Sequence, residues 1–232
     1  MLFDETLSGI DAWLDAKRSS GRLAEYEPSV VGWPLEKSVV LKAETGLELG
    51  NPLQASMSLT IWGKKDSLQD RIALIGPDLS TAGGDSLPLA RLILVNGDFS
   101  DEYESYRDLM SAVYGLDLRG VTSRSLPSRH EIWLRISQEA LRNGLSLQTM
   151  GNALLNHLKQ LEEVKSAQIV FVTDMVDILE LQPIAEKAQS IMNALVKMYD
   201  EMNFDCETCE YVEVCDEVVE LRNIRERLKG SN

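Results

Sequence analysis

The sequence lacks any apolar run of the roughly 18 to 20 residues that a membrane-spanning helix needs. Its N-terminal segment, MLFDETLSGIDAWLDAKR, carries acidic residues where a secretory signal peptide carries basic ones. We therefore expect a cytoplasmic protein without a membrane segment.

Basic residues are scarce as well, with 23 Lys and Arg against 37 Asp and Glu and a formal net charge of −14. Binding to nucleic acid or to an anionic membrane requires clustered Lys and Arg, so we expect neither partner. The loop around Gly83-Gly84 lacks the GK[ST] ending of a phosphate-binding loop. No Ser-His-Asp or nucleophile-elbow pattern is present, which disfavours hydrolase chemistry.

Cysteine is confined to one short run, Cys206-x2-Cys209-x5-Cys215. An odd number of cysteines in a chain without an export signal favours metal ligation over structural disulfides. A Cys-x2-Cys turn brings two thiolates to one metal ion or iron–sulfur cluster, and Cys215 is a candidate third ligand. Structural zinc and [4Fe–4S] sites usually take four ligands. The candidates for the fourth are Asp205, Glu207, Glu210, Asp216, His130 and His157.

The alternative is that these cysteines are ordinary reduced thiols. The acids around them raise the cost of forming thiolates, although they also favour a bound cation. His130 and His157 are more typical of ordinary surface or core histidines, because nothing at helical spacing completes a site around either.

The spacing of apolar residues predicts an α+β protein. A helical repeat predicts helices over residues 3–19, 101–114 and 147–161, one with Pro183 in its first turn, and one from Cys215 to Lys229. Apolar alternation or short apolar runs predict strands between Pro52 and Gly63 and over 71–75, 89–95, 132–136 and 167–173. Residues 25–34 and the segment around Pro127 are expected to be irregular.

We therefore predict a mainly antiparallel β lobe followed by a smaller α/β lobe with a C-terminal helix. The predicted divisions are an N-terminal helix and arm (1–24), the β lobe (25–100), the α/β lobe (101–203), and the cysteine motif with the terminal helix (204–232). The apolar stripe of the terminal helix is a candidate surface for a homodimer or another partner.

Trp133 and Arg135 are expected on one face of a strand, with Leu134 and Ile136 on the other. An aromatic ring beside a guanidinium can stack on a base or hold a phosphate. The more common interpretation is a half-buried Trp at a sheet edge with an Arg extending past it to solvent.

Several segments, taken in order, resemble the acetyl-CoA synthase family, the β subunit of the CO dehydrogenase/acetyl-CoA synthase complex. They are LELGNPLQASMSLTIW (47–62), IALIGPDL (72–79), PLARLILVNG (88–97), RHEIWLRISQEALRNGLSLQTMGNALL (129–155) and the cysteine run. The resemblance covers roughly residues 45 to 215, and IWLRIS is its closest local match.

The resemblance implies anaerobic one-carbon metabolism, in which CO, a methyl group and coenzyme A are joined at a [4Fe–4S] cluster bridged to two metal ions. It implies that Cys206 and Cys209 match the first pair of cluster ligands and that Cys215 matches the third. It also implies a coenzyme A surface at Arg129, Trp133 and Arg135. The fourth cluster cysteine and the nickel-binding Cys-Gly-Cys segment have no counterpart before Asn232, so we expect an accessory role rather than full synthase activity.

The expected partners are a corrinoid methyl-carrier protein or a subunit of the CO dehydrogenase type. Two alternatives stay open. The cysteines could form a structural zinc or electron-transfer iron–sulfur site on a non-catalytic domain, or the chain could be a coenzyme A-binding enzyme of another type.

Overall fold

The computed structural model describes residues 1–29, 32–126, 130–200 and 209–230. Its elements are α1 (Asp4–Ser19), β1 (Leu23–Tyr26), η1 (Lys42–Glu44), β2 (Thr45–Leu49), β3 (Ser56–Gly63), β4 (Arg71–Ile75), η2 (Leu79–Thr81), β5 (Ser86–Leu87), β6 (Leu89–Gly97), α2 (Glu102–Tyr114), β7 (Val121–Leu126), β8 (Glu131–Ser137), α3 (Gln138–Arg142), α4 (Leu147–Leu158), β9 (Val164–Val172), α5 (Met175–Asp200), α6 (Val212–Glu217) and α7 (Val219–Gly230). The predicted α+β class is confirmed.

A five-stranded mixed sheet with the order β1-β4-β9-β6-β3 forms the centre of the molecule. Strand β9 runs parallel to β4 and antiparallel to β6, and β3 pairs parallel to β6. The predicted division near residue 100 stays a prediction, although β9 is hydrogen-bonded between two strands that precede that position.

A second sheet has the order β5-β2-β8-β7. Strand β8 is antiparallel to both of its neighbours, with Arg135 opposite Glu48 on β2 and Trp133 opposite Arg124 on β7. Along β8 buried and half-buried residues alternate, so one face of this sheet packs inward and the other points outward.

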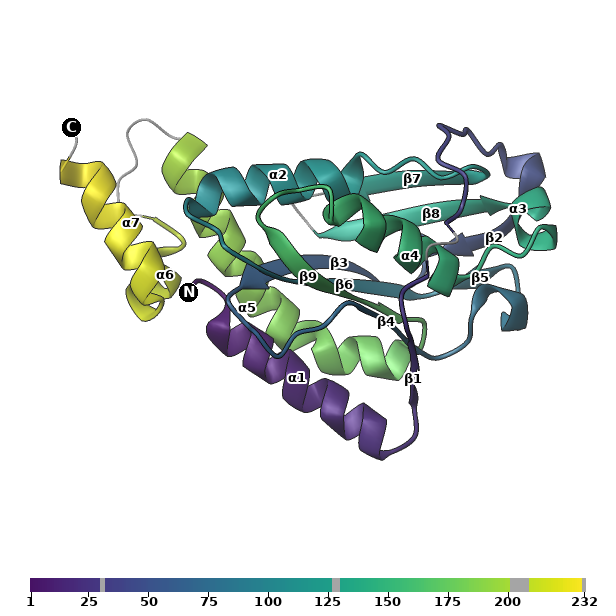
Figure 1. The fold of residues 1–232 in the computed structure, drawn as a ribbon, viewed down its shortest axis with the longest axis horizontal. Coiled ribbons are helices and arrows are strands. Elements are labelled where there is room, and N and C mark those ends of the chain that lie inside the picture. Colours follow the sequence, from purple (N-terminus) through teal and green to yellow (C-terminus); the bar gives the residue numbers. More distant parts are fainter. Residues whose placement is uncertain (30–31, 127–129, 201–208, 231–232) are drawn as a thin grey trace.

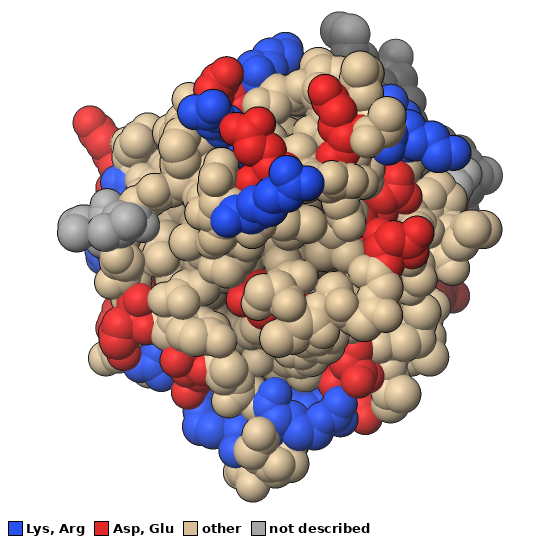
Figure 2. All heavy atoms as spheres, turned by 90° about the vertical axis from the view of Figure 1, so that its right-hand side faces the viewer, with Lys and Arg blue, Asp and Glu red and all other residues tan. Residues whose placement is uncertain are grey.

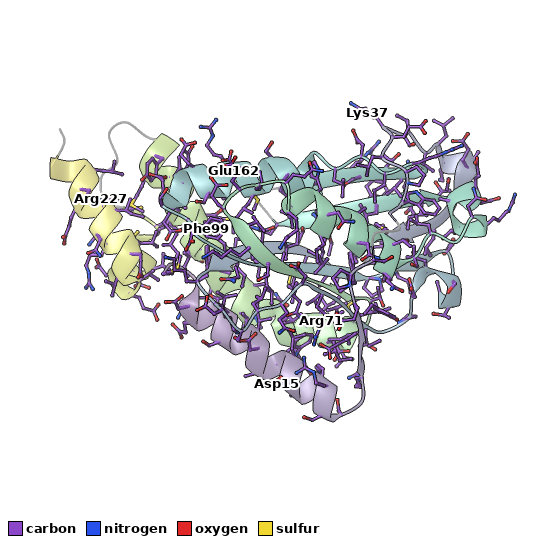
Figure 3. The ribbon with its side chains drawn as sticks, viewed as in Figure 1. Asp15, Lys37, Arg71, Phe99, Glu162 and Arg227 are labelled. Atoms are coloured by element: carbon purple, nitrogen blue, oxygen red, sulfur yellow. The ribbon has the colours of Figure 1, made fainter. Side chains whose placement is uncertain are left out.

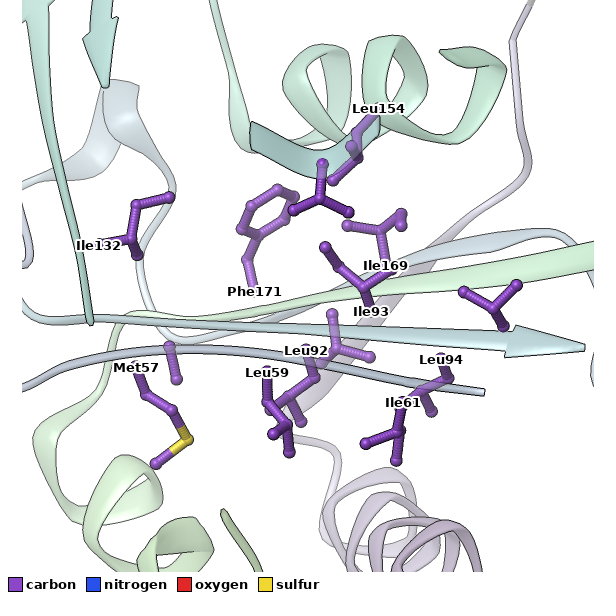
Figure 4. Packing of buried hydrophobic residues seen from close by; sticks show 14 of the residues in the cluster. Met57, Leu59, Ile61, Leu92, Ile93, Leu94, Ile132, Leu154, Ile169 and Phe171 are labelled. Atoms are coloured by element: carbon purple, nitrogen blue, oxygen red, sulfur yellow. The ribbon is translucent and has the colours of Figure 1, made fainter. Parts of the chain in front are cut away.

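Helices cover both faces of the central sheet (Figure 1). Met57, Leu59 and Ile61 of β3 point toward α5 and α1, whereas Phe171 of β9 points toward Leu154 of α4 (Figure 4). Burial of both faces explains why β6 is buried along its whole length and why β9 is apolar over residues 169–172. No described helix combines the length and the apolar character needed to span a bilayer.

A buried ion pair joins α1 to α5. Asp177 of α5 has no exposed side-chain surface, and its carboxylate lies 2.7 Å from Nζ of Lys17. Arg22 donates two further hydrogen bonds to the same carboxylate, at 3.0 and 2.7 Å. The opposite charges therefore share one pocket between the first helix and the long helix that follows the sheet.

Trp62 lies near the C-terminal end of β3 and packs against the N-terminal segment. Its ring is fully buried and packs edge-on against Phe3, with 4.8 Å between ring centroids. Its indole N–H donates to the carboxylate of Glu102 at 2.8 Å. Because burial disfavours the charged carboxylate, the pKa of Glu102 is raised.

Several predicted boundaries differ from the structure. The sequence did not predict β1, β2, β5 or β7, which are short or polar strands. Pro183 lies inside α5 rather than in its first turn, because the helix begins at Met175, where the Asp174 carboxylate accepts from two backbone N–H groups. The terminal helix is divided, since Val218 adopts an extended conformation between α6 and α7.

Candidate coenzyme A surface and thiol cluster

The outward face of β7 and β8 carries Trp133, Arg135 and Arg124. The predicted alternation is confirmed, since Leu134 and Ile136 are buried while Trp133 and Arg135 are half-buried. Arg124 reaches this face because it lies directly opposite Trp133 on the neighbouring strand. Arg129, the third residue expected here, lies outside the described residues.

The ring of Trp133 is flanked by cations. The Cζ atoms of Arg135 and Arg124 lie 4.5 and 5.3 Å from its centroid, which is cation–π distance. Nε of Arg135 donates to the Glu48 carboxylate at 2.9 Å. The indole N–H of Trp133 is buried without a hydrogen-bond partner among the described residues.

Arg124 differs from Arg135 in its pairing. Its side chain is exposed, and within the described ranges it contacts the Trp133 ring but no carboxylate. A guanidinium left unpaired in a chain with 37 acids keeps its donors available for a bidentate partner such as phosphate. Sequence reasoning missed Arg124 because β7 was predicted to be an irregular segment.

A cleft lies at the end of the second sheet where β8 ends, and its lining does not include Trp133, Arg135 or Arg124. Its volume is about 710 Å³, within the range of ligand pockets. Ser137 at the end of β8 lines it together with Lys37 and Arg119. Figure 3 places Lys37 at the upper edge of the molecule above β7, and Figure 2, which faces the end that carries α3, shows acidic and basic side chains interspersed around a largely uncharged centre. The carboxylates nearest Arg119 are 3.6 and 3.8 Å away, at the long end of ion-pair distances.

Two of the three candidate metal ligands converge on one small cavity. Cys215 is buried and Cys209 half-buried, and both line a space of about 20 Å³ between α5 and the C-terminal helices. Lys197 and Arg225 line the same space, and these cations would offset the negative charge of thiolate ligands. Cys206 lies outside the described residues.

Of the acidic residues predicted as fourth ligands, Asp205 and Glu207 lie outside the described residues, and Glu210 and Asp216 are already paired. Lys197 lies 3.5 Å from Glu210, and Arg225 lies 2.6 Å from Asp216, so both carboxylates already face a cation. Within the described ranges no group of three or more Cys, His, Asp and Glu side chains is arranged to hold a metal. Cys209 and Cys215 thus line one cavity and are of the residue type that a metal or cluster requires, but the described residues supply no third ligand.

The two histidines lie elsewhere. His130 is buried between β3 and α5 with a left-handed backbone φ of 51°, and burial lowers its pKa. His157 is half-buried on α4. Figure 1 places α6 and α7 at one end of the molecule and the β7–β8 sheet toward the other, so the thiols and the Trp133 surface are separate sites.

Comparison with known proteins identifies one family. A sequence model described as the CO dehydrogenase/acetyl-CoA synthase complex beta subunit matches residues 28–178. The chain is 25% identical over 205 residues to the acetyl-CoA decarbonylase/synthase complex subunit beta of Archaeoglobus fulgidus, covering 84% of this chain and 38% of that protein. It is 23% identical over 196 residues to subunit beta 2 of Methanosarcina mazei, covering 81% and 41% respectively. The match therefore spans about two fifths of these relatives.

Proposed function

The chain belongs to the CO dehydrogenase/acetyl-CoA synthase complex beta-subunit family, and from this premise we propose that it binds coenzyme A on the outward face of β7 and β8. The observation that carries the proposal is the contact between the Trp133 ring and the guanidinium of Arg124, which pairs with no carboxylate among the described residues. The match covers only about two fifths of these relatives. We therefore propose an accessory role in such a complex for this chain, rather than full synthase activity.

Each residue of this surface has a separate proposed role in binding coenzyme A. Arg124 offers planar, paired N–H donors to a phosphate of coenzyme A, and Glu48 holds Arg135 against the ring so that the indole stays in place. The cleft lined by Ser137, two residues beyond Arg135 on β8, has room for the remainder of an extended ligand. Arg129 is proposed as a further phosphate contact because it is one of the three residues that the resemblance indicates.

Coenzyme A is expected to quench the tryptophan fluorescence of the full chain in a saturable way. Arg124→Gln should weaken binding about tenfold, since a charge-assisted hydrogen bond is lost. Trp133→Phe should remove most of the quenching, although Trp13, Trp33 and Trp62 remain. Titrations of both variants followed by fluorescence and calorimetry measure these effects.

The matched control is Arg107→Gln, which removes an exposed arginine of α2 whose carboxylate neighbour lies 3.4 Å away. This variant should bind coenzyme A as the unmodified protein does. Pantethine, which has no phosphate, should not quench. The proposal is wrong if millimolar coenzyme A changes nothing, or if Arg124→Gln and Arg107→Gln lower the affinity equally.

We propose further that Cys206, Cys209 and Cys215 hold a [4Fe–4S] cluster or another metal such as zinc. The convergence of Cys209 and Cys215 on a cavity lined by two cations supports this. A cluster there would supply an electron-accepting centre, and zinc would instead tie α6 to α5 as a structural element. An accessory role beside a corrinoid methyl-carrier or a dehydrogenase-type subunit is part of this proposal.

Protein prepared without oxygen is expected to contain stoichiometric iron or zinc. Cys209→Ser and Cys215→Ser should each lower the metal content by more than half, because a thiolate ligand is replaced by a poor one. Elemental analysis, with an ultraviolet–visible spectrum to separate a cluster from zinc, is the measurement. Glu213→Gln, an exposed change on α6, is the control and should keep its metal. Metal-free unmodified protein with normal circular dichroism would contradict the proposal.

A further inference from the structure

Arg91 is a buried arginine in the interior of the protein. It lies on β6, opposite Phe171 of β9 and beside Ser58 of β3, and only 9% of its surface is exposed. Nε and Nη2 both donate to the hydroxyl oxygen of Ser58, at 3.2 and 2.9 Å. A guanidinium has five N–H donors, and Nη1 has no acceptor among the described residues.

The charge of Arg91 is not balanced by a carboxylate in the described part of the chain. This is unusual in so acidic a protein, because the other buried cation, Lys17, is paired with Asp177. Burial lowers the pKa of Arg91 to about 10, so the side chain stays charged at neutral pH. The Tyr114 ring, 5.9 Å from Cζ, gives only a weak cation–π contact. An uncompensated buried charge costs several kcal/mol in general, so an anionic or strongly polar partner is expected beside it.

A cavity of about 40 Å³ adjoins Arg91 between the central sheet, α2, α4 and the second sheet. Its volume exceeds the roughly 10 to 15 Å³ that one water molecule requires. Its other walls are mainly apolar, with Val113, Leu134 and Phe171 among them, and one hydroxyl from Ser123. Asp117 and Ser123 line the cavity and are exposed, so the cavity reaches the surface beside the α2–β7 connection.

We propose that this cavity binds a small monocarboxylate, formate or acetate, with its carboxylate on the guanidinium of Arg91. Planar carboxylates match the fork of N–H donors, and a single methyl group suits the apolar walls. Sulfate and phosphate carry about two negative charges at neutral pH and are more strongly hydrated, so a space with one cation compensates poorly for their desolvation. The site is independent of the coenzyme A surface, because Leu134 faces the cavity while Trp133 points from the opposite face of β8.

Titration of the full chain with sodium formate and sodium acetate, followed by calorimetry and by melting temperature, tests the proposal against sodium chloride at equal ionic strength. Both carboxylates should bind saturably and raise the melting temperature, and chloride should do neither. Arg91→Met replaces the guanidinium by a shorter, uncharged, unbranched side chain and should weaken binding about tenfold or more. Arg107→Gln is the matched surface control and should bind normally.

Val113→Leu provides a second variant that keeps Arg91 in place. Its extra methylene takes the space of the methyl group, so acetate should lose more affinity than formate. Absence of saturable carboxylate binding, an equal response to chloride, or unchanged binding in Arg91→Met would each overturn the proposal and leave the cavity to water. Coenzyme A quenching of Trp133 would be unaffected by any of these results, so the two proposals fail separately.

Discussion

Asp177→Ala is expected to lower the free energy of unfolding by about 3 to 5 kcal/mol, because it removes the buried partner of Lys17 and leaves that cation only the partly exposed Glu180. Lys17 keeps only 10% of its side chain exposed in this pocket, and its Nζ lies 2.7 Å from the Asp177 carboxylate. Two hydrogen bonds from Arg22 are lost in the same variant. Urea denaturation followed by circular dichroism measures the change.

Two further variants separate the buried pair from exposed ones. Glu180 also pairs with Lys17, but it is 46% exposed, so Glu180→Ala should cost clearly less than Asp177→Ala. The double variant Lys17→Met/Asp177→Leu replaces the pair by apolar groups and should recover much of the loss. Equal destabilisation by Asp177→Ala and Glu180→Ala would show that the pair is not the stabilising contact between α1 and α5.

Trp62→Ala is expected to cost about 3 to 5 kcal/mol, the range for removing a large aromatic side chain from a core. The ring is fully buried, contacts Phe3 edge-on and lies 6.4 Å from the Tyr106 ring between centroids. Its removal leaves a void between β3, the N-terminal segment and α2. Thermal and urea denaturation should agree on the loss, and a loss below about 1 kcal/mol would contradict this packing.

Trp62→Phe isolates the hydrogen bond to Glu102 and makes a prediction about pH. Burial already raises the pKa of Glu102, and the indole N–H is a donor that opposes this rise. A folded-state pKa above the unfolded value means that the folded protein binds more protons between the two values, so stability falls as pH rises through that window. Without the indole N–H the folded-state pKa rises further. Trp62→Phe should therefore be most destabilising near pH 7 and least so near pH 4.5.

The sequence predicted the elements whose side chains repeat with a clear period. Residues 102–114 form a helix with Asp101 accepting from the backbone N–H groups of Tyr103 and Glu104, close to the predicted 101–114. Strand β8 and helix α4 were predicted for the same reason, because their buried faces are uninterrupted.

Strand β7 is polar and was not predicted from the sequence. Residues 121–126, with the sequence VTSRSL, have mostly Ser, Thr and Arg between their terminal apolar residues, so local pattern gives little sign of β7. Only pairing with β8 makes this segment a strand, and pairing with a neighbouring strand is an effect that the period of the segment itself does not encode. The same pairing places Arg124 on Trp133, which is why the candidate site was predicted without that residue.

The central position of β9 has a consequence for the order of folding. Strands β4 and β6 are far from β9 in the sequence, yet one edge of each strand pairs with β9. During synthesis, the edges of β4 and β6 that pair with β9 stay unpaired until residue 172 has left the ribosome. Such a topology has high contact order, so folding should be slow compared with helical proteins of this size.

Fragments ending before residue 164 should expose these strand edges and aggregate, whereas fragments that include β9 can complete the sheet.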